Sequence, residues 1–144
     1  MHLDTVFSIA SLLALIGWLA LLASPWAPVW SQRLAGVALP ALIAAMYAAL
    51  LLAFAGGASG SFSSLDGVAQ LFTSRPILLA GWLHYLAFDL VVGAWEVRDA
   101  RHRGVAFGWV VPCLIATFLA GPVGFLVWLL VRAVAGRSGD AAAR

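Results

Sequence analysis

Residues 76–103 read PILLAGWLHYLAFDLVVGAWEVRDARHR, and the rest of the chain is best understood from this stretch. Its first part is apolar enough to cross a lipid bilayer, yet it contains His84, Tyr85 and Asp89. An ionisable side chain such as Asp89 is costly in hydrocarbon, so within a membrane segment it marks a candidate functional site. A cluster of charged residues follows at the end of the stretch. We therefore expect a membrane helix around which the other segments pack.

The composition places the whole chain in a bilayer. It has 144 residues, of which 64% are hydrophobic and 10% charged. Long apolar runs at these values predict an all-α, polytopic membrane protein. The net charge of +2 comes from arginine without any lysine, which is too little for nucleic-acid binding. The single cysteine, Cys113, excludes an intrachain disulfide.

Hydropathy predicts four transmembrane helices in one domain over residues 1–136, with a disordered tail at 137–144. The predicted spans are residues 3–23, 33–55, 76–97 and 108–131. Pro25 and Pro28 separate the first two, because a helix cannot continue through both. In the fourth, Pro122 removes a backbone hydrogen bond, so we expect a kink or a local opening there. Four spans place both termini on one side of the membrane.

A short amphipathic helix is expected at about residues 64–73, between the second and third spans. The glycine-rich stretch 56–61 is typical of a flexible connector. Ser63 or Ser64 then caps the helix, and Asp66 lies in its first turn. We expect this helix to lie on the membrane surface, either as a cap on the bundle or as a lid over an opening from the lipid.

A strip of alanines runs along the second span. Small side chains let another helix approach closely, so the strip indicates helix packing, within the chain or with a second molecule. A homo-oligomer or a larger membrane complex is one such arrangement. The strip consists of Ala41, Ala44, Ala45, Ala48 and Ala49.

Helical periodicity separates the polar residues of the third span into two groups. At about 100° per residue, Trp82, Tyr85, Asp89 and Glu96 share one stripe, and Tyr85 is placed to donate a hydrogen bond to Asp89. His84 lies roughly 140° away, so it and Asp89 cannot form a dyad on one straight helix. They can still flank a groove between this helix and its neighbours.

An acid and a base beside an apolar groove suit a proton-transfer isomerisation of a lipid-like molecule. Desolvation favours the neutral forms, so Asp89 is the candidate proton donor and His84 the candidate acceptor, with Tyr85 in support. The alternative is that Asp89 and His84 only hold helices together by hydrogen bonds. The residues expected to contact the substrate are Trp82, Phe88, Trp95, Thr117, Gly121 and Pro122.

The charged cluster from Glu96 to Arg103 is expected to be solvated at the membrane surface. Asp99 and Arg103 can pair along the helix. The remaining arginines can meet lipid phosphates, so we expect Arg98, Arg101 and Arg103 to contact headgroups.

Several cofactor chemistries are excluded by the sequence pattern. His2 and His102 lie outside the apolar spans, so bis-histidine haem ligation in the bilayer lacks a second ligand. The di-iron carboxylate pattern of Glu-x-x-His pairs does not occur either. We therefore expect no metal and no cofactor.

The segment from Gly81 to Leu90, GWLHYLAFDL, together with residues 62–72 and Gly121–Gly124, resembles a known family. The chain is similar to the abscisic-acid-deficient-4-like membrane proteins of plants, algae and bacteria. The resemblance implies a role in converting violaxanthin to neoxanthin, by opening a 5,6-epoxide and removing a neighbouring proton to leave an allene. The composition suggests a bacterial member, located in the inner membrane.

Two functions follow from these observations. The first is an integral membrane protein that binds a carotenoid or similar isoprenoid, with or without isomerising it. The second is a non-catalytic membrane subunit that binds pigment or quinone, or stabilises a larger complex. For both functions, the expected partners are a lipid-soluble ligand and the surrounding membrane lipids.

Overall fold

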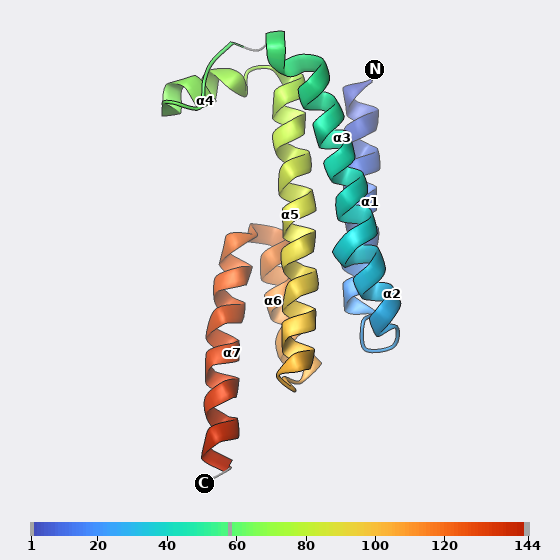
Figure 1. Ribbon diagram of the computed structural model, residues 1–144, viewed down its shortest axis with the longest axis vertical. Helices are drawn as coiled ribbons and strands as arrows, with labels where there is room; N and C mark the ends of the chain where they lie inside the picture. Colours follow the sequence, from blue (N-terminus) through green and yellow to red (C-terminus); the bar gives the residue numbers. More distant parts are fainter. Residues whose placement is uncertain (1, 58, 143–144) are drawn as a thin grey trace.

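The computed structural model describes residues 2–57 and 59–142, and within these residues every regular element is helical (Figure 1). Three segments are long and apolar enough to cross a bilayer. They are α1 (Leu3–Leu22), the continuous run Pro28–Gly57 and α5 (Arg75–His102). The run Pro28–Gly57 comprises α2 (Pro28–Arg33), a π-helical segment (Leu34–Ala38), α3 (Leu39–Phe54) and a 3₁₀ turn (Ala55–Gly57).

The long helix α5 lies at the centre of the fold. α1 and α3 pack along it, and the three helices run roughly side by side in Figure 1. As predicted, α5 continues from the apolar segment into the charged one, ending at His102. The π-helical segment lies just before Pro40, which has no backbone N–H to donate a helical hydrogen bond.

The predicted fourth span at 108–131 is wrong as a single helix. The segment forms two helices, α6 (Phe107–Ala120) and α7 (Pro122–Ala142), which meet at Gly121 and run in opposite directions beside the lower half of α5 (Figure 1). Gly121 has φ +36°, a conformation that glycine adopts readily, and Pro122 suits the first position of a helix. The chain therefore turns back where a kink was expected. We call this pair the α6–α7 hairpin.

The hairpin changes the placement of the termini. α6 has 14 residues, about 21 Å of helix, whereas a bilayer core is about 30 Å thick. The N- and C-terminal ends of the chain consequently lie at opposite ends of the molecule in Figure 1, not together as four spans would place them. α7 extends to Ala142, into the tail predicted to be disordered, and residues 143–144 lie outside the described residues.

The short helix between the second and third spans is present as α4 (Leu65–Leu71). Ser64 caps it, accepting a hydrogen bond from the backbone N–H of Gly67 at 3.1 Å, as the sequence predicted. α4 projects sideways from the upper end of the bundle (Figure 1). Leu65 on this helix is largely exposed, and Phe72 just after it lies against Gly81 of α5.

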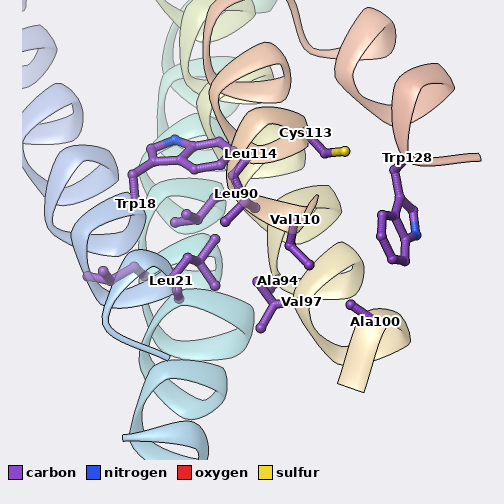
Figure 2. Close-up of a cluster of buried hydrophobic side chains, with 12 residues drawn as sticks. Trp18, Leu21, Leu90, Ala94, Val97, Ala100, Val110, Cys113, Leu114 and Trp128 are labelled. Atoms are coloured by element: carbon purple, nitrogen blue, oxygen red, sulfur yellow. The ribbon is translucent and has the colours of Figure 1, made fainter. Parts of the chain in front are cut away.

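The hydrophobic core is divided along α5. The lower cluster joins α1, α5, α6 and α7 with Ala35 and Leu39 of the run Pro28–Gly57. Figure 2 shows Trp18 and Leu21 on one side, Trp128 on the other, and side chains of α5 and α6 between them. The upper cluster draws its buried residues from α1, α3 and α5 alone. The hairpin therefore completes the core around the lower half of α5 and leaves the upper half without it. The upper cluster consists of Ala10, Ala14, Ile43, Leu50, Leu79, Ala80, Leu83, Leu86 and Ala87.

The alanine strip of the second span faces outward. Its five members are exposed on α3, while Ile43 and Leu50 of the same helix are buried against the bundle. The strip is thus not used for packing within this chain.

Candidate functional site

Asp89 lies against the turn of the α6–α7 hairpin. Its residue is only 9% exposed, and its Oδ2 atom is buried without a hydrogen-bond partner in the part of the chain that the structure describes. A Cβ atom at Gly121 would lie 2.7 Å from Oδ1 of Asp89. Only a glycine lets the backbone of the turn approach the carboxyl group this closely. The carboxyl group therefore faces the interior of the bundle, but it lies against the hairpin turn and does not line an apolar groove as expected from the sequence.

Tyr85 lies one helical turn above Asp89 and contacts the same hairpin. Its hydroxyl group donates a 3.3 Å hydrogen bond to the backbone carbonyl of Phe118, and it also interacts with the Asp89 carboxyl group. The Tyr85 ring packs on Trp82 with centroids 5.3 Å apart, and Trp82 continues to Phe7 at 5.8 Å. An aromatic row therefore extends from the carboxyl group towards the upper end of α5.

Glu96 is fully buried, which corrects the prediction that it belongs to a solvated cluster. Its Oε1 atom accepts a 2.8 Å hydrogen bond from the hydroxyl of Thr117, and its Oε2 atom is buried without a partner among the described residues. Gly124 of α7 approaches Thr117 from the other side, leaving no room for a Cβ atom. Thr117, predicted to contact substrate, is fully buried, and its hydroxyl group is hydrogen-bonded to Glu96.

Asp99 forms the lowest contact between α5 and the hairpin. Arg103 donates to both of its oxygens at 3.0 and 2.9 Å, as the sequence predicted. The indole N–H of Trp128 donates to Oδ2 at 3.1 Å, and Arg132 approaches the same oxygen at 3.4 Å. These two partners on α7 were not predicted, because hydropathy alone does not reveal which helix covers Asp99.

His84 points away from this stripe. It is exposed on the side of α3, where its ring stacks on Phe88 (4.6 Å between centroids) and lies 5.7 Å from Tyr47. Helical periodicity predicts that His84 and Asp89 lie on different faces of the helix, and the structure does not bring them together. Phe88, predicted to contact substrate, is 59% exposed on the same face as His84.

The remaining residues predicted to contact substrate are Trp82, Trp95, Gly121 and Pro122. Trp82 is 41% exposed, whereas Trp95 stacks on Phe125 and lies beneath the guanidinium group of Arg132. Gly121 and Pro122 form the hairpin turn.

The arginines predicted to contact lipid headgroups are exposed and also bonded within the chain. Arg98 donates to the side chain of Gln32, and Arg101 donates to the carbonyl of Ser24 at 3.1 Å. Arg103 pairs with Asp99.

Asp99 differs from Asp89 and Glu96 in having positively charged partners. Arg103 and Arg132 pair with Asp99, while within the described residues no arginine forms an ion pair with Asp89 or Glu96. A buried carboxylate without a counter-ion is strongly unfavourable, so both groups are expected to be neutral acids. No cluster of three or more metal-ligating side chains occurs among the described residues.

Two hollows lie beside the upper half of α5, on either side of Trp82. One of about 290 Å³ reaches α1 and is lined by Leu3, Asp4, Phe7, Arg75, Leu78, Leu79 and Trp82. The other, of about 250 Å³, reaches the end of α4 and is lined by Phe72, Leu78, Gly81 and Trp82. Asp89 does not line either of them, but Trp82 connects both to Tyr85. We call the two together the upper recess.

The sequence matches the family model described as ABA DEFICIENT 4-like over residues 5–128, and the chain belongs to this family. Comparison with curated proteins and with solved structures gives no match. The family and the long apolar helices are together consistent with an integral membrane protein.

Proposed function

We propose that this ABA4-like protein binds a carotenoid or a similar isoprenoid in a bacterial inner membrane and isomerises it by proton transfer. The observation that supports this function is the position of Asp89. It is a buried carboxyl group with an unpartnered oxygen, one helical turn from the aromatic row that leads to the upper recess. The family model supports the ligand class, through its link to neoxanthin synthesis.

The upper recess suits an elongated apolar ligand. The hairpin reaches up to Tyr85, which contacts Phe118 of α6, and above Tyr85 the side of α5 borders α1 and the end of α4. From Leu78 to Asp89 the helix rises about 16 Å, at about 1.5 Å per residue. A ligand lying along Leu78 and Trp82 would thus place one end near Tyr85 and Asp89. The ion pair between Arg75 and Asp4, 2.9 Å long, marks the polar end of the recess.

The chemistry requires an acid at an epoxide oxygen. A neutral Asp89 donates its proton to that oxygen as the carbon–oxygen bond breaks, and Tyr85 orients the carboxyl group. A water molecule then accepts the proton that a neighbouring carbon loses, and the electron pair of that carbon–hydrogen bond forms the allene. Gly121 covers the carboxyl group, so the hairpin turn must shift slightly before a ligand atom reaches Oδ2. His84 lies on another face of α5, and we do not assign it to this step.

A second candidate function is a non-catalytic subunit that binds pigment or quinone, or that stabilises a larger membrane complex. The exposed alanine strip of α3 favours it, since a smooth helix face in lipid allows a second helix to approach closely.

Expression in a membrane that makes violaxanthin separates the two functions. Chromatography of the extracted pigments should show a new allenic product that disappears with Asp89→Asn. Asp66→Asn is the matched control, because Asp66 is exposed on α4 and its loss should leave the product unchanged. Pigment that co-purifies without conversion would support the subunit. Absence of both product and bound pigment would exclude the two functions with a carotenoid ligand.

A further inference from the structure

Glu96 is a buried acid for which the proposed reaction has no role. It is 0% exposed, and Oε2 has neither a hydrogen-bond donor nor a counter-ion among the described residues. Asp89, seven residues earlier on the same face of α5, is in the same condition. Each of the two carboxyl groups thus has one buried oxygen without a partner, which a docking contact does not require, since Asp99 docks α7 with every partner supplied.

The hairpin covers these two acids with Thr117 and Gly121. Thr117 and Gly121 are one turn apart on α6, and they contact Glu96 and Asp89 respectively. Gly124 of α7 packs against Thr117 from behind. The carboxyl groups are separated by about 10 Å of axial rise, with the Thr117 hydroxyl at the lower end of the interval. Arg132 and Arg103 are engaged by Asp99.

We propose that Glu96 is a proton reservoir for Asp89: both carboxyl groups are protonated in the resting protein, and Glu96 replaces the proton that Asp89 gives to its ligand. This inference deepens the function proposed above and rests on it for the donation step. In the transfer, the O–H bond of Glu96 breaks and an O–H bond forms on Asp89, and water molecules that enter when the hairpin turn shifts carry the proton between the two groups. The Thr117 hydroxyl stabilises the resulting Glu96 carboxylate, which later regains a proton from water. No electrons are transferred.

Infrared spectroscopy of the full-length protein in lipid nanodiscs tests the resting state without any ligand. At neutral pH we expect two carbonyl-stretching bands of protonated carboxyl groups. Glu96→Gln should remove one and Asp89→Asn the other, while Asp99→Asn should remove neither, since Asp99 is ion-paired. A spectrum in which Glu96→Gln removes no such band overturns the proposal. Thr117→Val gives an independent measurement if Glu96→Gln does not fold: it should shift the Glu96 band, and an unshifted band also overturns it.

Deuterium exchange tests the transfer itself. Transfer into D₂O shifts each carboxyl band as its proton is replaced, and the Asp89 band should exchange on the order of tenfold more slowly in Glu96→Gln than in the wild type. Glu96→Asp, which retains an acid, should partly restore the rate. An Asp89 exchange rate unchanged by Glu96→Gln overturns the reservoir. Absence of isomerisation by a wild-type protein that shows both effects would instead refute the proposed function alone.

Discussion

Gly121 closes the α6–α7 hairpin directly against the carboxyl group of Asp89, so close that a Cβ atom at position 121 would lie 2.7 Å from Oδ1. The residue that turns the chain and the residue proposed to donate the proton therefore share one contact. A change at either position should affect both the fold of the hairpin and the chemistry.

Gly121→Ala should destabilise the protein by about 1–3 kcal/mol, because an alanine is strained at φ +36° and its methyl group meets Asp89. Thermal unfolding in detergent, followed by tryptophan fluorescence, measures the change. Gly108→Ala is the matched control, since nothing lies within 4 Å of a Cβ atom there. Equal midpoints for the two variants would show that the turn does not constrain the hairpin.

Thr117→Val should destabilise the protein by about 1–3 kcal/mol, because it removes the hydrogen-bond donor of a buried carboxyl group. Thr117→Ser keeps the hydroxyl group and loses one methyl group, so it should be milder. Denaturation of both variants under the same conditions gives the comparison. Our account of the Glu96–Thr117 contact fails if serine proves as harmful as valine.

Trp128→Phe should lower stability by about 1–3 kcal/mol. The substitution keeps an aromatic ring in the lower core but removes the N–H that donates to the Asp99 carboxylate. Trp109→Phe is the control, because Trp109 is 65% exposed. The same unfolding assay measures both, and a larger loss in the control would contradict this assignment.

His84→Phe should retain most of the isomerase activity, whereas Tyr85→Phe should reduce it by about tenfold or more. Tyr85 interacts with Asp89 and with the hairpin, while His84 stacks on Phe88 on another face. Pigment analysis of the two variants, at matched protein levels, provides the measurement. Complete loss of product in His84→Phe would restore histidine as the base expected from the sequence.

Reporters fused to the two ends of the chain should be found on opposite sides of the membrane. Three segments long and apolar enough to cross a membrane precede the hairpin, and α7 runs back towards the end of the molecule at which α6 begins. Fusions of alkaline phosphatase and of a fluorescent protein, each active on one side only, give the readout. If both ends report the same side, residues 107–142 cross the membrane as a fourth span.

The sequence was sufficient to predict the parts of the fold that depend on local chemistry. Residue types at short spacing account for three such features: the long helix α5, the break between Pro25 and Pro28, and the Ser64 cap. Helical periodicity also predicted correctly that His84 and Asp89 face different ways.

The hairpin could not be predicted in this way. Residues 108–131 are apolar enough for a span, and a Gly-Pro pair is compatible with a kink as well as with a reversal. The choice depends on the fit between Gly121 and Asp89, a contact between segments about 30 residues apart. Glu96 was misjudged for a related reason: its neighbours in sequence are charged, but the helix that covers it comes later in the chain.

The α6–α7 hairpin lies beside only the lower half of α5, so the two halves of the bundle differ in how they cover this helix. On the side of the C-terminus, the α6–α7 hairpin covers the acidic residues of α5, whereas towards the N-terminus α5 borders two hollows. A lipid-soluble molecule diffusing in the membrane would then reach Tyr85 and Asp89 from one leaflet only. Its orientation at the acid would be decided by the leaflet in which it dissolves.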